Sequence, residues 1–340
     1  MIFRSSALLL ALFATGCSSS SGDADKPDAS TSSDGGTSSS DGATTSTGDA
    51  APSKVTVTTI TPDAKIEPAY VGVLKSGNLI LTEGQKLKAD EMETGGKVTH
   101  VNSTDFTGFE WPRAIAVDDT GQVYIAGYQT IHSFAKGPSD PRKSWSTATA
   151  AKATYEWVTY GGNPKKVWAL TGTSPTSPKM QFVRFDAATA DAAGTATVVY
   201  DVDRFAVMSF VVDGQNNVFT VDTNSCRIRK ISAGGTVAVI AGKPGTAGGS
   251  CNIGAAYGKD SDGNVSLPQA GALGWDPTGT RLLLAGAGQL ADVTEGSDGK
   301  SKAQVLHTFE DGVTPDAIAT SADAVYVVDR AHGNVRKVVF

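Results

Sequence analysis

Histidines, the side chains most often used for catalytic zinc or for general-base chemistry, are scarce in this sequence. Its 340 residues contain four of them: His100, His132, His307 and His332. A catalytic zinc site needs several ligands that converge, and the repeat positions assigned below place only His332 on a loop face. We therefore predict no histidine metal site. The sequence also lacks a Gly-x-Ser-x-Gly elbow, a Walker loop and a paired-cysteine motif.

Clustered oxygen ligands occur in one segment, Asp260–Asn264 (DSDGN). Carboxylates and amides at close spacing are typical ligands of calcium. The segment lacks the regular D-x-D-x-D-G spacing and the distal Glu of a calcium loop. A solvated turn is therefore the preferred interpretation. We expect no cofactor, and the alternative is a calcium ion.

The elements that must position any site are short strands that recur along the chain. Residues 206–242 read as four strands, Val207–Val212, Val218–Val221, Arg227–Ile231 and Thr236–Ile240, separated by turn residues. The second strand of this unit recurs six times, at Leu79–Leu81, Val123–Ile125, Val167–Ala169, Val218–Thr220, Leu282–Leu284 and Val325–Val327. The intervals are 44, 44, 51, 64 and 43 residues. This period predicts an all-β fold, a six-bladed β-propeller.

Two repeats carry a more specific pattern. Residues 211–224 (VVDGQNNVFTVDTN) are followed by Arg227–Ile231 (RIRKI), and residues 324–330 (AVYVVDR) by Asn334–Val338 (NVRKV). Both resemble NHL repeats, and the resemblance extends over residues 54–340. It implies a propeller and leaves the function open. Arg227, Arg229, Arg336 and Lys337 are expected to form a solvated strand face.

Ring closure is predicted from the two ends of this region. The last repeat reaches the end of the sequence after its third strand, while residues 54–60 (KVTVTTI) resume β character before the first repeat. The N-terminal strand is expected to complete the last blade, because closure removes the exposed sheet edge. The propeller should then span residues 54–340.

The first 17 residues are interpreted as a signal peptide. Arg4 precedes the apolar run Ala7–Ala14, which is too short to span a bilayer. The run leads into Ala14-Thr15-Gly16-Cys17, which resembles a bacterial lipobox with Ala14 where leucine is usual. The resemblance implies lipidation of Cys17. An ordinary secretory signal with an incidental cysteine is the alternative.

Residues 18–53 are expected to be a disordered tether. They contain twelve Ser, six Asp and no aromatic residue, Leu, Ile, Val or Met, so burial cannot offset the chain entropy lost on ordering. Anchor and tether together predict a monomeric protein of the bacterial cell envelope, lipid-anchored in the outer membrane and facing either the periplasm or the cell surface.

Two cysteines remain in the propeller, Cys226 and Cys251. An oxidising compartment favours a disulfide between them. Cys226 ends the loop between the second and third strands of blade 4, and Cys251 lies in the connection to blade 5. Both connections emerge on the same face of a propeller. Two free or buried thiols are the alternative.

The mouth of the central channel is the candidate ligand site. The first strand of each blade should line the channel, and its first residues should surround one mouth. These positions carry polar side chains of both signs: Glu67, Arg113, Glu156, Arg204, Gln269 and Asp316. Concave propeller mouths often bind ligands, but ordinary polar residues at strand starts would look the same.

A binding or scaffold module that presents a rigid face to a protein or carbohydrate is the leading functional interpretation. The alternative is a hydrolase or lyase, lactonase-like, with one divalent metal at the channel mouth. A structural envelope protein without a specific ligand is a third. The net charge of −6 argues against nucleic acid as a partner.

Overall fold

The computed structural model describes residues of the propeller region. They are residues 55–83, 89–100, 112–127, 131–134, 143–145, 154–172, 178–186, 195–205, 207–222, 227–242, 258–259, 265–266, 271–286, 288–295, 301–309, 313 and 315–340. The chain divides into two units, residues 1–51 and 52–340, and every described residue lies in the second.

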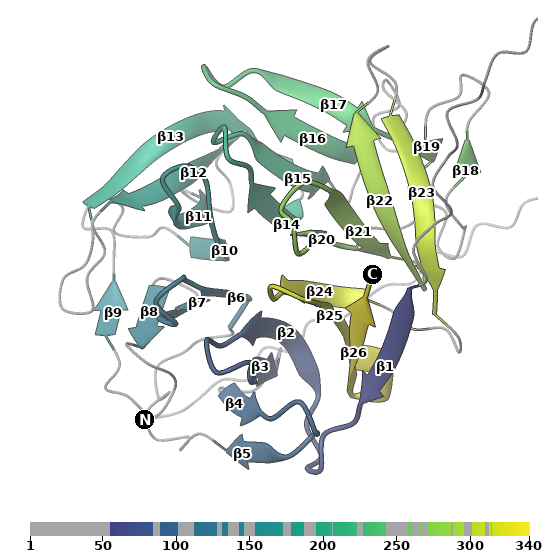
Figure 1. Cartoon of the computed structure of the whole chain (residues 1–340). Helices are drawn as coiled ribbons and strands as arrows, with labels where there is room; N and C mark the ends of the chain where they lie inside the picture. Colours follow the sequence, from purple (N-terminus) through teal and green to yellow (C-terminus); the bar gives the residue numbers. More distant parts are fainter. Residues whose placement is uncertain are drawn as a thin grey trace, which may run out of the picture. The chain divides into compact units, whose positions relative to one another are not determined.

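Six four-stranded antiparallel sheets form a ring in this second unit, so the fold is a six-bladed β-propeller (Figure 1). Blade 1 comprises β2 (Pro68–Val73), β3 (Leu79–Glu83), β4 (Ala89–Met92) and β5 (Val98–His100). Blade 2 comprises β6 (Ala114–Val117), β7 (Val123–Ala126), β8 (Ile131–Phe134) and β9 (Lys143–Trp145). Blade 3 comprises β10 (Thr154–Gly161), β11 (Lys166–Gly172), β12 (Lys179–Asp186) and β13 (Thr195–Asp203).

The remaining blades repeat the pattern. Blade 4 comprises β14 (Val207–Val212), β15 (Val218–Asp222), β16 (Arg227–Ile231) and β17 (Val237–Ala241). A small hairpin, β18 (Gly258–Lys259) and β19 (Val265–Ser266), precedes blade 5, which comprises β20 (Ala272–Trp275), β21 (Leu282–Gly286), β22 (Gln289–Glu295) and β23 (Ser301–Thr308). Blade 6 comprises β24 (Pro315–Thr320), β25 (Val325–Asp329), the 3₁₀ turn η2 (Arg330–His332) and β26 (Asn334–Val339), with β1 (Thr56–Ile60) as its outer strand.

The ring closes through β1, as predicted. This strand pairs antiparallel with β26, in a register that runs from Thr56 opposite Val339 to Ile60 opposite Val335. The described third strand of blade 1 is Ala89–Met92, with Leu79 opposite Met92 in the ladder. The sequence pattern favours Lys86–Ala89 for this strand, and residues 86–88 lie outside the described ones.

Aspartates hold the tight turns between the first and second strands of several blades. Oδ1 of Asp118 accepts the backbone N–H groups of residues 120 and 122, both at 2.9 Å. Oδ1 of Asp213 accepts those of residues 215 and 217, both at 2.8 Å. Oδ1 of Asp276 accepts those of residues 280 and 281, at 2.8 and 3.0 Å. The recurring Asp in the sequence pattern thus has a physical role, since its carboxylate replaces missing backbone partners.

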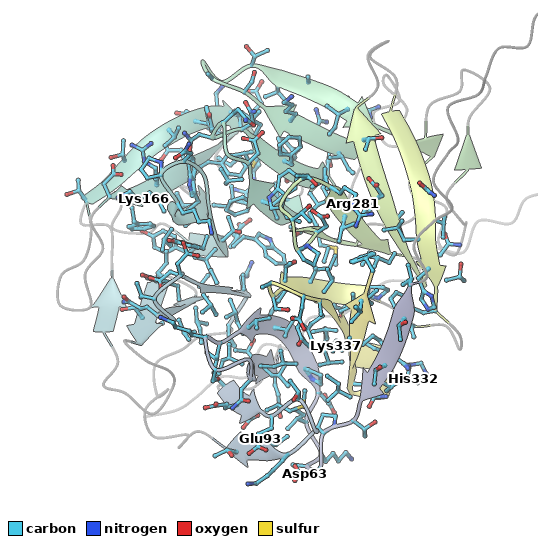
Figure 2. The ribbon with its side chains drawn as sticks, in the orientation of Figure 1. Asp63, Glu93, Lys166, Arg281, His332 and Lys337 are labelled. Carbon is cyan, nitrogen blue, oxygen red and sulfur yellow. The ribbon has the colours of Figure 1, made fainter. Side chains whose placement is uncertain are left out.

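The hydrophobic core is divided among the six interfaces between neighbouring blades. Figure 2 draws the side chains on the ring of blades. Each interface has its own cluster of buried side chains. The cluster between blades 3 and 4, for example, includes the fully buried Trp168 and Phe182, and the ring of Phe182 meets that of Phe210 edge to face at 5.3 Å. A blade is therefore stable only with a neighbour on both sides.

Deleting residues 54–60 is expected to destabilise the whole ring. The deletion exposes the edge of β26 and removes Ile60 from the cluster between blades 6 and 1. We expect the melting temperature to fall by at least about 10 °C, or folding to be lost, as measured by circular dichroism. Deleting seven residues within 30–36 should leave the melting temperature unchanged. An equal effect of both deletions would contradict a closing role for β1.

Replacing Asp276 by Asn should alter how stability depends on pH. Burial alone would raise the pKa of Asp276, but hydrogen bonds from Arg281, Thr278 and Thr280 lower it to about 2. Because an unfolded Asp titrates near pKa ~3.9, this carboxylate stabilises the native state above about pH 4, and the effect disappears as the pH falls towards 2. The deficit of D276N in urea unfolding should therefore shrink across that range.

Asp292→Asn provides a control of opposite sign. Burial raises the pKa of Asp292 above its usual value, so its ionised form opposes folding once the pH exceeds the ordinary carboxyl pKa. The D292N variant should gain stability relative to wild type as the pH rises. Parallel pH profiles for the two variants would contradict pKa shifts of opposite sign at these two carboxyl groups.

Candidate ligand site at the channel mouth

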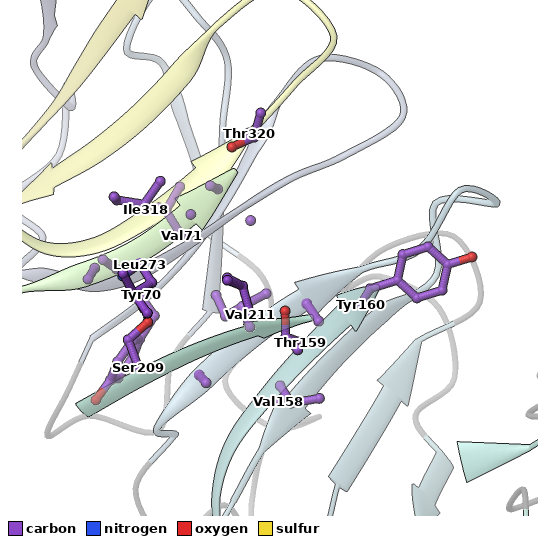
Figure 3. A pocket seen from close by; sticks show the side chains of 18 of the residues that line it. Tyr70, Val71, Val158, Thr159, Tyr160, Ser209, Val211, Leu273, Ile318 and Thr320 are labelled. Atoms are coloured by element: carbon purple, nitrogen blue, oxygen red, sulfur yellow. The ribbon is translucent and has the colours of Figure 1, made fainter. Parts of the chain in front are cut away.

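The first strands of all six blades, β2, β6, β10, β14, β20 and β24, surround a central channel of about 210 Å³ (Figure 3). Its wall is largely aliphatic, with Val71, Val211, Leu273 and Ile318 among its side chains. Glycines keep the strands close: a methyl group on Gly274 would come within 2.5 Å of Cγ2 of Ile318. The channel is therefore a tightly built axis, lined mostly by small or apolar groups.

A second, wider cavity of about 400 Å³ lies where these strands begin, and we call it the mouth cavity. Its lining comes from blades 1, 2, 3, 4 and 6: Ala69, Tyr70, Pro112, Arg113, Glu156, Trp157, Val207, Met208, Asp316 and Arg330. Charged groups of both signs therefore meet two aromatic rings and a methionine in one concave space. That combination can hold a polar molecule with an apolar face.

Tyr70 and Trp157 form the floor of the mouth cavity. Both residues line the mouth cavity and the channel, and their rings meet edge to face with centroids 5.5 Å apart. Since Tyr70 belongs to blade 1 and Trp157 to blade 3, this contact reaches past blade 2. Edge-to-face pairs of this kind add to the stability gained by burial, so the floor is a defined surface.

Two carboxylates at the mouth each have an arginine nearby. Oε1 of Glu156 lies 3.3 Å from Nη2 of Arg204, and Oδ2 of Asp316 lies 3.8 Å from Nη1 of Arg330. All four side chains are partly exposed, so the pairs are solvated and individually weak. Either carboxylate can therefore exchange part of its arginine contact for a ligand.

Arg113 differs from these arginines. Its backbone N–H donates to the carbonyl of Ala126 at 3.0 Å, which fixes the chain just before β6. Within the part of the chain that the structure describes, its guanidinium forms no ion pair and donates no hydrogen bond. A cation in a partly enclosed site that lacks a counter-ion favours an anionic group there.

Two ionisable groups of the cavity have shifted pKa values. Burial raises the pKa of Tyr70, and Asp316 adds to this, while Arg113 and Arg330 oppose it. Burial also raises the pKa of Asp316, with Asp329 adding to the rise and Arg330 opposing it. Tyr70 therefore keeps its proton at neutral pH and can donate a hydrogen bond from its hydroxyl group.

Asp329 holds the turn that carries Arg330. Its carboxylate is fully buried and accepts hydrogen bonds from Nη2 of Arg336 at 2.7 Å and from Nε at 3.2 Å. Nδ1 of His332 lies 2.9 Å from the same carboxylate. Gly333 caps the end of η2 with a φ of 66°. Arg336 also donates to Oγ1 of Thr59 on β1. This network connects the ring-closing strand to the cavity wall.

The six residues expected at the mouth have different outcomes. Arg113, Glu156 and Asp316 line the mouth cavity. Arg204 is not a lining residue, but it pairs with Glu156, which is one. Glu67 is exposed and is not among the lining residues. Gln269 lies outside the described residues, as do Cys17, Cys226, Cys251 and Asp260–Asn264.

Of the lining residues that were not expected, Tyr70, Trp157 and Arg330 carry the polar or aromatic groups that matter most for a ligand. Trp157 directly follows the expected Glu156, at a bulge that shifts the ladder of β10 between Tyr155 and Trp157. Tyr70 lies three positions after the expected Glu67, at a similar shift in the ladder of β2 between Pro68 and Tyr70. Arg330 comes from the 3₁₀ turn η2, directly after β25.

The basic strand segments are a correction. They were expected to be solvated, but Arg227 is buried, and Nη2 of Arg229 lies 2.7 Å from the buried carboxylate of Asp222. Arg336 pairs with Asp329 at the same distance. The same ion pair thus recurs in blades 4 and 6, between the second and third strands.

Among the described residues, no group of three or more His, Cys, Asp or Glu side chains is placed to hold a metal ion. No helix in that part of the chain is long and apolar enough to cross a membrane.

Comparison with known proteins gives structural neighbours only. No family model matches the sequence, and no curated protein does. Virginiamycin B lyase from Staphylococcus aureus aligns over 84% of this chain and 100% of its own, with a TM-score of 0.54 and 13% identity. A gluconolactonase from Xanthomonas campestris aligns over 85% and 90%, with a TM-score of 0.58 and 12% identity.

A third neighbour is the PQQ-bound aldose sugar dehydrogenase from Streptomyces coelicolor. It aligns over 85% of this chain and 99% of its own, with a TM-score of 0.56 and 12% identity. At these identities the likeness shows the fold alone. By that measure the chain is similar to β-propeller proteins, among them a lyase, a lactonase and a dehydrogenase.

Proposed function

We propose that this chain is an exported, lipid-anchored binding protein whose propeller holds a small saccharide in the mouth cavity. The observation that carries the proposal is the convergence of Glu156 and Asp316 with the rings of Tyr70 and Trp157 in one cavity of about 400 Å³. Carboxylates accept hydrogen bonds from sugar hydroxyls, and aromatic rings pack on the C–H faces of sugars. The volume lies within the range typical of small-molecule sites.

The arrangement of the two carboxylates supports this ligand class. Glu156 stands on blade 3 and Asp316 on blade 6, which occupy opposite positions in a ring of six. A sugar ring lying across the axis would therefore meet an acceptor on either side, with Tyr70 and Trp157 below it. Charge-assisted hydrogen bonds of this kind contribute about 1.5–3 kcal/mol each.

A hydrolase or lyase with one divalent metal at the same mouth is the second candidate. The favouring observation is again the pair Glu156 and Asp316, because carboxylates are the side chains that hold calcium. The neighbours named above include a lyase and a gluconolactonase. The two candidates use the same side chains, so a metal measurement separates them.

Asp316→Asn should weaken saccharide binding at least tenfold, because it removes a charged acceptor without changing the side-chain volume. The measurement is isothermal titration of the full-length chain with a panel of neutral and acidic saccharides. Asp292→Asn on β22 is the matched control, since Asp292 is also a partly buried carboxyl but lies outside the cavity lining. Absence of binding by every saccharide, or equal losses in both variants, would contradict the proposal.

Elemental analysis of the same preparations addresses the second candidate. About one calcium or zinc ion per chain, kept in D292N and lost in D316N, would replace the binding interpretation with the metal-dependent enzyme. Wild-type protein that binds a saccharide after treatment with a chelator would support the binding protein.

The envelope location is proposed from residues 1–53, with lipidation at Cys17 and an acidic tether. Cys17→Ser should move the protein from the detergent phase to the aqueous phase in a phase-partition assay, because one anchor chain contributes about 0.8 kcal/mol per buried CH₂. Ser18→Ala, next to the acylation site, should partition like wild type. A detergent-phase C17S variant would contradict the anchor.

A further inference from the structure

The charges around the mouth cavity do not balance once each carboxylate is assigned its neighbour. Glu156 lies beside Arg204 at 3.3 Å, and Asp316 beside Arg330 at 3.8 Å. Arg113 lines the same cavity without a carboxylate partner among the described residues. One positive charge is therefore left over in a site that is partly shielded from water.

A hydrogen-bond donor lies close to this charge. Within the described part of the chain, the Tyr70 hydroxyl makes no hydrogen bond to the protein, and it lies in the electrostatic field of Arg113, Asp316 and Arg330. Its ring is fixed by the edge-to-face contact with Trp157. The hydroxyl therefore has a defined position and a proton to donate.

We infer that the ligand of the mouth cavity carries a single carboxylate, which Arg113 binds with the Tyr70 hydroxyl as a second donor. This rests on the proposed saccharide site and narrows its ligand to sugar acids such as uronates. Guanidinium groups bind carboxylates through two parallel N–H···O bonds. Arg113 comes from blade 2, between the blades that carry Tyr70 and Trp157, so all three can contact one end of a sugar ring.

The number of charges distinguishes a carboxylate from the alternatives. A neutral sugar would leave the Arg113 guanidinium partly desolvated without a counter-ion, which costs free energy. A phosphate dianion would bring two negative charges to one unpaired cation and place them near Glu156 and Asp316. A monoanion matches the excess charge and leaves its hydroxyls for the two carboxylates.

The experiment compares ligands that differ only at C6 of the sugar. The full-length chain is titrated calorimetrically with glucuronate, glucose and glucose 6-phosphate, and with the three corresponding galactose compounds. In at least one series the uronate should bind at least tenfold more tightly than the neutral sugar and the phosphate. Its affinity should fall as salt is raised, whereas that of the neutral sugar should not.

Two variants test the assigned residues. Arg113→Gln should lower the uronate affinity at least tenfold, to about that of the neutral sugar, and should not weaken binding of the neutral sugar. Tyr70→Phe keeps the ring contact with Trp157 and should lower the uronate affinity about three- to tenfold. Arg184→Gln is the control, since Arg184 pairs with Asp186 on β12, away from the cavity.

The outcomes separate this inference from the saccharide site itself. If neutral sugars bind as tightly as uronates and R113Q changes nothing, the carboxylate inference is overturned and the saccharide site stands. If the 6-phosphates bind most tightly, the charge assignment is wrong. If none of the six compounds binds, both the saccharide site and the carboxylate inference fail. Melting curves of R113Q and Y70F show whether a loss of affinity reflects a loss of folding.

Discussion

The pairing of β1 with β26 is the contact on which the rest of the propeller depends. Five residue pairs join the two ends of the described chain, from Thr56 with Val339 to Ile60 with Val335. Every hydrophobic cluster lies between two neighbouring blades, so each blade needs both neighbours. Because the mouth cavity takes its lining from blades 1, 2, 3, 4 and 6, its shape exists only while the ring is closed. In this fold the geometry of the site therefore depends on the pairing of the closing strand.

One buried carboxylate connects closure to the site. Arg336 contacts Thr59 on β1 and also Asp329, whose carboxylate is fully buried and holds the turn that carries Arg330. Burying a carboxylate is costly unless it is paired and hydrogen-bonded, and the contacts with Arg336 and His332 meet that condition. Blade 4 contains the same pair, Asp222 with Arg229, without a closing strand. The blade-6 pair is thus a feature of the repeat that also orders a cavity residue.

The sequence allowed the fold to be predicted closely where local signals and the ladder agree. In blade 4, the turn at Asp213 and the strand patterns on either side of it predicted both ends of β14 and β16 correctly. In blade 1 the third strand was expected at Lys86–Ala89, and the described strand is Ala89–Met92. The register depends on which residue faces Leu79 across the ladder, and an alternation with a period of two does not determine that residue.

The site was predictable only in part. Strand-start positions identified Arg113, Glu156 and Asp316, but the contact of Tyr70 with Trp157 joins residues 87 positions apart and leaves no local pattern.

A ring of six blades brings six strand starts together whatever residues occupy them. The neighbours named as a lyase, a lactonase and a dehydrogenase share the propeller fold at 12–13% identity. The fold therefore brings side chains together but does not determine their chemistry. In this chain the two carboxylates at the mouth each have a guanidinium nearby. Arg113, in contrast, has no carboxylate partner among the described residues. The two paired carboxylates can accept hydrogen bonds from any ligand with hydroxyl groups, while an unbalanced charge beside a fixed aromatic floor discriminates between ligands. The specificity of this mouth should therefore depend more on Arg113 than on the more numerous paired groups around it.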